Sequence, residues 1–113
     1  MKISKTPPPP YYAVIFVSTL TETHEGYSEA ADRMVELAET QQGYLGIETV
    51  RDESGLGVSI SYWTDLESIK NWKHNSEHLA VQQQGKAKWY NEYITRICKV
   101  ERDYRFEKPV DEK

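Results

Sequence analysis

The order of apolar and polar positions along the chain predicts four strands. Residues 11–19 (YYAVIFVST) are apolar at both alternating positions, a pattern typical of a strand that is covered on both faces. Residues 45–52 and 56–64 are separated by a short glycine-containing connection, and we expect them to pair as an antiparallel hairpin. A last strand over residues 93–106 is expected to be unusually long, because strands typically have about five or six residues.

Two helical stretches separate these strands. Residues 26–42 carry apolar side chains three and four positions apart, with acidic residues on the other side, which predicts an amphipathic helix. A second stretch is expected to start at Thr64, whose spacing to Glu67 is that of a capping box. Asn75 and Ser76 are expected to interrupt this stretch and to cap another helix over residues 77–90.

The order β-α-β-β-α-β predicts a ferredoxin-like α+β fold, a four-stranded antiparallel sheet with helices on one face. Residues 11–106 are expected to form this single domain. Residues 1–10 end in four prolines and predict an extended polyproline arm against a strand edge, or alternatively a ligand for an SH3-like partner. Residues 107–113 are expected to be a polar tail.

The helix-free face of the predicted sheet has no second layer within the chain. The first strand is apolar on both faces, and no segment remains to cover the second of them. The same face of another copy would supply that cover. We therefore expect a homodimer with two sheets packed face to face, in which the end of the long last strand reaches the partner's sheet.

Composition narrows the possible partners. The 113 residues carry 14 Lys and Arg against 18 Asp and Glu, without a basic block, so no nucleic-acid surface is expected. The chain has no run of roughly 18 apolar residues, so no membrane partner is expected and we expect a cytoplasmic protein. Cys98 is the single cysteine, so an internal disulfide is excluded, and we expect this residue to be small and buried packing.

Candidate chemistry is concentrated between residues 62 and 93. Strand alternation sends Ser61 and Trp63 to one face of the sheet and Tyr62 to the other. A pocket lined by rings and a few polar groups is the usual form of a small-molecule site, although packing in a core or interface explains each ring alone. The helical part adds these candidates: Trp72, His74, His78, Gln82 and Trp89.

Other chemistries have weaker support. His74 and His78 are four residues apart, as two metal ligands on one helix would be. The expected break at Asn75 separates them and no third ligand is evident, so no metal site is predicted. The chain lacks the nucleophile elbow of a serine hydrolase and a phosphate-binding glycine loop, so nucleotide cofactors are not indicated. Arg96 would either reach a pocket or pair with an acid.

These residues carry a resemblance to a known family: Ser61-Tyr62-Trp63, Trp72-Lys73, His78, Ala80, Gln82 or Gln83, Gly85, Trp89-Tyr90, Tyr93, Arg96 and Val100-Glu101-Arg102-Asp103-Tyr104. From Tyr12 to Tyr104 the chain resembles the antibiotic biosynthesis monooxygenase family of dimeric α/β barrels, in particular its YqjZ-like bacterial branch. Members are ferredoxin-like homodimers. Some oxidise polycyclic phenols to quinones with molecular oxygen and no cofactor, and others bind and open heme.

The chain departs from both of these family chemistries. Quinone-forming members use an Asn near the end of the third strand, where this chain has Ser61, and a hydroxyl cannot reproduce an amide. Heme-degrading members combine an Asn on the first strand, a Trp on the helical segment and a later His that binds iron. Trp72 matches the Trp, but Val17 or Ser18 stands at the Asn position and Gln82 at the His position.

The residues and the resemblance together lead to one hypothesis, a cofactor-independent monooxygenase acting on a small aromatic or phenolic molecule. Trp72 would form the pocket wall, His78 would act as general base or proton shuttle, and Ser61 would form a hydrogen bond with the reacting molecule. The substrate-binding residues would be Tyr62, Trp63, His74, Gln82, Trp89 and Arg96. The alternatives are a non-catalytic dimeric, stress-related module that binds an aromatic molecule, and a heme-binding or heme-degrading protein.

Overall fold

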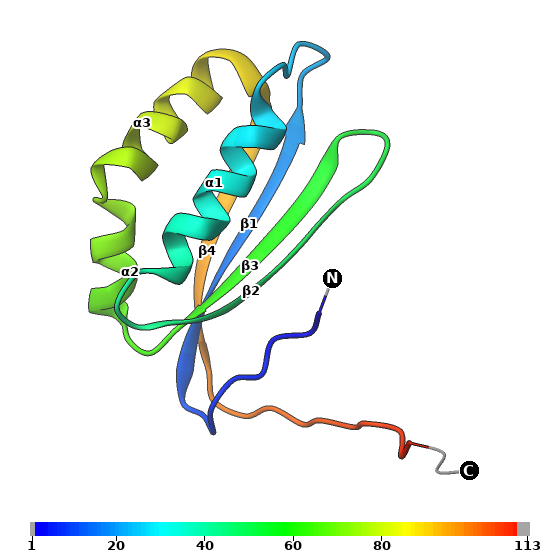
Figure 1. The fold of residues 1–113 in the computed structure, drawn as a ribbon, viewed down its shortest axis with the longest axis vertical. Helices are drawn as coiled ribbons and strands as arrows, with labels where there is room; N and C mark the ends of the chain where they lie inside the picture. Colours follow the sequence, from blue (N-terminus) through cyan, green and yellow to red (C-terminus); the bar gives the residue numbers. More distant parts are fainter. Residues whose placement is uncertain (1, 111–113) are drawn as a thin grey trace.

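The computed structural model describes residues 2–110, and within them a four-stranded antiparallel sheet carries all helices on one side (Figure 1). The strands are β1 (Tyr11–Leu20), β2 (Tyr44–Arg51), β3 (Leu56–Trp63) and β4 (Tyr90–Val100). The helices are α1 (Tyr27–Glu39), α2 (Leu66–Lys73) and α3 (Ser76–Gln84), and a π-helical turn, η1 (Gly85–Trp89), leads into β4. The predicted ferredoxin-like α+β fold is confirmed.

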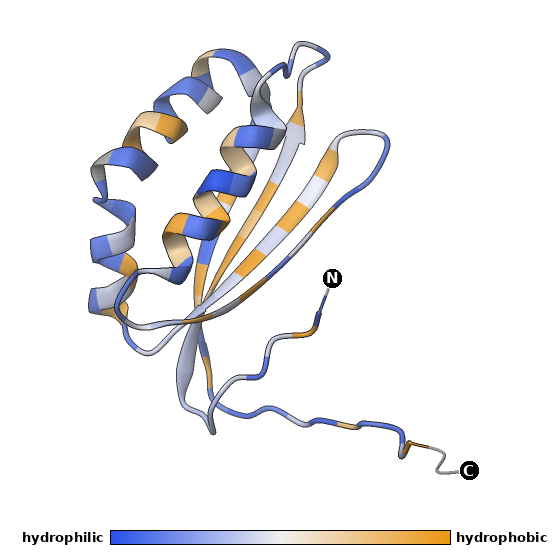
Figure 2. Ribbon diagram, viewed as in Figure 1, coloured by the Kyte–Doolittle hydropathy of each residue, from blue (hydrophilic) through white to orange (hydrophobic). Residues whose placement is uncertain are grey.

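The strand order β2-β3-β1-β4 and the register define two sides of the sheet. Val14 of β1 lies opposite Ser61 of β3 and Ile97 of β4, and this row shares the helix-facing side with Trp63. The neighbouring positions, such as Ile15 opposite Arg96, lie on the helix-free side. Figure 2 shows the resulting alternation of apolar and more polar residues along β3.

Local signals position the helix boundaries. The side chain of Asn75 accepts hydrogen bonds from the backbone N–H groups two and three residues later, so the predicted interruption at this residue is confirmed. The predicted cap at Thr64 is wrong by one residue, because the carboxylate of Asp65 accepts from the Ser68 N–H at 2.7 Å. The first helix also ends at Glu39, three residues before its predicted end.

The last strand is shorter than predicted. β4 ends at Val100, where Tyr11 is its partner on β1, and from Glu101 onward the chain leaves the sheet with exposed side chains (Figure 1). Because β4 pairs only with β1, its ladder cannot continue past the first residue of that strand. Cys98, expected to be buried, is exposed because it lies on the helix-free side of the edge strand β4.

The N-terminal arm covers one end of the helix-free side. The backbone N–H of Ser4 donates to Glu48 Oε2 at 2.8 Å, and the Ser4 hydroxyl donates to the carbonyl of Ile47 on the edge strand β2. The hydroxyl of Thr6 donates to that of Tyr11, which is buried. Apolar side chains remain exposed farther along this side, at Val50, Leu56 and Ile94. Among the described residues, no helix is long and apolar enough to cross a membrane.

Candidate functional site

Three rings from three successive elements form a continuous stack on the helix-facing side. Trp63 ends β3 and is fully buried, with 0 % relative exposure. Its ring centroid lies 6.0 Å from that of Trp72 on α2, at an interplanar angle of 27°. The Trp72 ring lies 4.1 Å from the imidazole of His78 on α3, at 15°. The stack therefore runs from the sheet, through α2, to the first turn of α3.

Caps and one ion pair position this stack. The Asn75 cap breaks the helical segment between Trp72 and His78 and turns α3 back, so that the imidazole returns to the indole. Arg33 of α1 binds Glu77, the neighbour of His78, through two hydrogen bonds of 2.7 and 3.0 Å. This bidentate, solvent-exposed pair links the first turn of α3 to α1.

The surroundings of His78 determine its protonation. Its Nδ1 lies 2.9 Å from the Trp72 carbonyl oxygen, which can only accept, so Nδ1 carries the hydrogen and Nε2 has the free lone pair. Burial lowers the pKa of His78 below its usual 6.5, and the bond to the Trp72 carbonyl opposes this shift. The imidazole is therefore neutral at pH 7.

The second ring nitrogen of His78, Nε2, has a free lone pair. It has no hydrogen-bond partner in the described part of the chain, and no buried polar side-chain atom there lacks a partner. Nε2 must therefore contact solvent. A neutral imidazole with a fixed tautomer and an accessible lone pair can accept a proton from a bound molecule.

Two further candidates lie close to this stack. The hydroxyl oxygen of Ser61 accepts a hydrogen bond from Trp63 Nε1 at 2.9 Å, and its own hydrogen remains available to a ligand. Gln82 is half-buried one turn after His78 on α3. Trp63, Trp72, His78, Ser61 and Gln82 thus belong to one region, which we call the Trp72–His78 site.

Three other candidates lie elsewhere. Tyr62 faces the helix-free side, where its hydroxyl donates to Glu48 Oε1 at 2.7 Å. Burial and the Glu48 carboxylate raise the Tyr62 pKa, so this hydroxyl stays neutral. Arg96 also lies on the helix-free side, opposite Ile15, and the exposed His74 ends α2. The structure does not bring these three side chains into the Trp72–His78 site.

Trp89 belongs to a second aromatic cluster at the opposite end of the sheet. Its buried ring donates from Nε1 to the carbonyl of Glu25 at 3.0 Å, which fastens η1 to the loop before α1. The ring of Tyr27 lies 5.6 Å from that of Trp89, edge to face. This bonding pattern gives Trp89 a structural role.

The same cluster also contains Phe16 and Arg51, which were not among the candidates predicted from the sequence. Phe16 lies 5.5 Å from Tyr90 and 5.2 Å from Tyr93, measured between ring centroids. Arg51 reaches this cluster by crossing β3 at Gly57, where a side chain would block it. In the sequence, the only sign of this path is that Gly57 lies directly across the hairpin from Arg51. This pairing can be recognised only when the register of the two strands is known.

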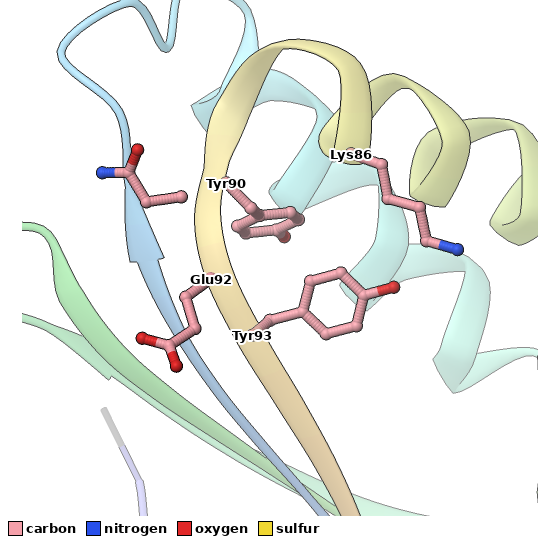
Figure 3. A pocket seen from close by; sticks show the side chains of 5 residues that line it. Lys86, Tyr90, Glu92 and Tyr93 are labelled. Atoms are coloured by element: carbon pink, nitrogen blue, oxygen red, sulfur yellow. The ribbon is translucent and has the colours of Figure 1, made fainter.

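Two surface hollows open at this end of the molecule. One of about 410 Å³ is lined by Thr23, Glu25, Lys88 and Trp89. The other, of about 290 Å³, is lined by Lys86, Tyr90, Asn91, Glu92 and Tyr93 (Figure 3). Neither is lined by Trp72 or His78. Within residues 2–110 no three His, Cys, Asp or Glu side chains are grouped so that they could hold a metal ion.

The chain is a ferredoxin-like domain, with an aromatic cluster that includes a histidine between the helices and the sheet. Residues 10–84 match the family model described as antibiotic biosynthesis monooxygenase. The chain is 46% identical over 110 residues to the uncharacterised protein YqjZ of Bacillus subtilis, covering 97% of this chain and 96% of that protein. The chain belongs to the antibiotic biosynthesis monooxygenase family, as its residues predicted.

Solved structures share the fold at low sequence identity. PA3566 from Pseudomonas aeruginosa superimposes with a TM-score of 0.69 at 17% identity, over 87% of this chain and 99% of that one. SnoaB from Streptomyces nogalater, described as a cofactor-independent oxygenase, gives 0.72 at 12% identity, over 84% and 97%. At these identities the likeness concerns the fold alone.

Proposed function

We propose that this protein is a cofactor-independent oxygenase of a small aromatic or phenolic molecule, with His78 as its general base. One observation carries the proposal: the bond from His78 Nδ1 to the Trp72 carbonyl leaves Nε2 unprotonated, beside two stacked indoles. An acidic C–H or O–H group bound at Nε2 would transfer its proton to it. Family membership and the oxygenase described for SnoaB support this reaction class.

The atoms and electrons of the proposed reaction balance with the substrate and molecular oxygen alone. His78 removes a proton from the substrate, and the resulting electron-rich carbanion or phenolate passes an electron to molecular oxygen. For a substrate with a CH₂ group between aromatic rings, the substrate radical and superoxide would combine at that carbon and take back the proton from His78 to form a hydroperoxide. Loss of water would then break the O–O bond and leave a carbonyl on that carbon. Trp63 and Trp72 would hold the planar ring away from water, and the Ser61 hydroxyl would donate to the anion.

The ligand would lie along the row formed by Ser61, Val14 and Ile97. This row crosses three strands on the helix-facing side, starting from the Trp72–His78 site. At its β4 end Ile97 is 53 % exposed and the neighbouring Thr95 is exposed as well, so this end is open to solvent. A planar molecule can therefore approach the stack from the β4 edge.

A homodimer is part of the proposal. The exposed apolar side chains on the helix-free side, Val50, Leu56 and Ile94, would be covered by the same side of a second copy. The exposed segment from Glu101 to Val110 leaves the sheet at the end of β4 and would extend along the partner. Dimerisation would leave the helix-facing side, and with it the Trp72–His78 site, open to ligand.

Oxygen consumption tests the proposed activity. The purified protein would be assayed with anthrones, catechols and hydroquinones, against the uncatalysed rate of each compound. Saturable, protein-dependent uptake with one of these classes is the expected result. Tryptophan fluorescence quenching without oxygen uptake would contradict the proposal and indicate the non-catalytic binding module.

Heme binding is the second candidate, because the accessible Nε2 of His78 is also a possible iron ligand. Heme titration followed at the Soret band tests this reading. A stoichiometric Soret band that disappears in His78→Ala would favour it over the oxygenase, whereas no band at stoichiometric heme would remove it.

A further inference from the structure

Arg51 places an unusual positive charge on the helix-facing side of the sheet. Its side chain crosses β3 directly over Gly57, where a Cβ atom would lie 2.5 Å from Arg51 Cζ. Beyond the glycine, one terminal nitrogen donates to Ser18 Oγ at 2.7 Å and to the Tyr27 hydroxyl at 2.9 Å. Ser18 is 2 % exposed. The guanidinium therefore lies over the two central strands, near the β2–β3 hairpin and beside the first residue of α1.

No carboxylate neutralises this charge. Arg51 donates only to neutral acceptors, the hydroxyls of Ser18 and Tyr27 and the carbonyls of Ser18 and Gly55. Across residues 2–110 the recorded ion pairs involve Arg33 alone. Charges withdrawn from water are normally paired, so an uncompensated guanidinium makes its surroundings favourable for an anion.

The smaller hollow lies beside this charge. Tyr93, which lines the hollow, is the cross-strand neighbour of Ser18 on the helix-facing side. Figure 3 shows the side chains of Lys86, Tyr90 and Tyr93 on the same side of β4, whereas Glu92 points to the other side, as its pairing with Thr19 requires. The one acidic residue of the lining is thus directed away from Lys86.

The walls that Tyr90 and Tyr93 give the hollow are aromatic. The rings of Tyr90 and Tyr93 lie 5.5 Å apart, edge to face, and both contact Phe16. Burial raises the pKa of Tyr90 well above its usual 10, so this hydroxyl adds no negative charge at neutral pH. The volume of about 290 Å³ is at the lower end of ligand pockets, which span roughly 300–1,000 Å³. It suits a ligand of one or two rings.

We propose that this hollow is a second ligand site that binds an aromatic carboxylate. The ring of the ligand lies against Tyr90 and Tyr93, its carboxylate pairs with the ammonium of Lys86, and the Tyr93 hydroxyl donates to the same carboxylate. Arg51 contributes its charge without a contact, because its terminal N–H groups are already donated within the protein. The site does not depend on the proposed oxygenase chemistry at His78.

Titration with a charged and a neutral probe of equal shape tests this site. We expect 2-naphthoate to bind saturably in calorimetry and to shift the Tyr93 ring resonances in NMR spectra. We expect 2-naphthamide to bind at least about tenfold more weakly, since it lacks the charge-assisted bond. Equal affinity for the two probes, or no saturable binding of 2-naphthoate, would overturn the proposal.

Three variants distinguish a specific contact of Lys86 with the ligand from a general effect of surface charge. Lys86→Gln should raise the Kd for 2-naphthoate about tenfold and leave that for 2-naphthamide unchanged, and Lys86→Arg should keep most of the affinity. Lys88→Gln is the matched control, because Lys88 is exposed on the same turn but lines the other hollow. An unchanged Kd in Lys86→Gln, or an equal loss in Lys88→Gln, would refute the site. Binding that depends on Lys86 in a protein without oxygen uptake would leave this inference standing and reject only the oxygenase.

Discussion

The imidazole of His78 lies flat on the indole of Trp72, 4.1 Å away, while its Nδ1 donates to the carbonyl oxygen of that same tryptophan at 2.9 Å. A single residue thus fixes both the plane of the imidazole and its tautomer. The ring cannot turn to present Nδ1 to a ligand without losing the hydrogen bond. Nε2 is therefore the nitrogen of His78 that would act as the base in the proposed reaction.

His78 should titrate below the usual value of 6.5, because burial disfavours its charged form. The unfolded chain then takes up a proton near pH 6.5 and the folded protein only at lower pH. The free energy of unfolding should therefore be greatest above pH 6.5 and decrease as the pH falls below it. An NMR titration of the imidazole carbon-bound protons and urea unfolding at pH 7 and pH 5.5 measure both effects. A His78 pKa at or above 6.5 would be inconsistent with the packed ring.

Replacing Trp72 by Leu should raise the pKa of His78 toward 6.5, since removal of the stacked indole admits water to the imidazole. Trp72→Phe, which keeps an aromatic face, should cause a smaller change in the same direction. The NMR titration distinguishes the three proteins. If Trp72→Leu leaves the pKa of His78 unchanged, the indole is not what buries the imidazole.

Gly57→Ala should lower the free energy of unfolding by roughly 1–3 kcal/mol, because the new methyl group occupies the path of the Arg51 side chain. In an Arg51→Ala background the path is empty, and the same change should cost much less. Urea denaturation of the wild type, both single variants and the double variant measures the coupling between the two positions. Additive effects would show that the glycine is not needed for the passage of Arg51.

The proposed homodimer should form through the helix-free side. Ile94 is 45 % exposed on that side, and Ile94→Glu should give a monomer in sedimentation velocity at micromolar concentration. Leu66→Glu is the matched control, because Leu66 is also an exposed apolar residue but lies on α2. A monomeric wild type, or a dimer that persists in Ile94→Glu, argues against this interface.

The sequence was sufficient for features that depend on local periodicity. The alternation around Ser61, Tyr62 and Trp63 fixes their faces, because successive strand residues always point to opposite sides. The Asn75 break was visible because a side chain that caps a helix is recognisable from its neighbours alone. These two signals were enough to place Ser61 and Trp63 on one face of the sheet and Tyr62 on the other, and to separate His74 from His78.

Features that depend on a distant partner were not predictable in the same way. The end of β4 at Val100 depends on where β1 begins, and not on the composition of β4 itself. The contact of Trp72 with His78 spans a helix break, so no helical periodicity relates the two residues. The path of Arg51 over Gly57 requires the cross-strand register. Each of these follows from tertiary geometry.

Oxygen uptake by His78→Gln, with a phenolic substrate that the wild type turns over, shows whether His78 is the general base. Glutamine retains hydrogen-bonding capacity but cannot act as a base at neutral pH, so the rate should fall about 10²–10⁴-fold while fluorescence quenching still reports binding. His74→Gln, on the exposed end of α2, should keep the wild-type rate. A His78→Gln protein that consumes oxygen at the wild-type rate would contradict the assignment of His78 as the base.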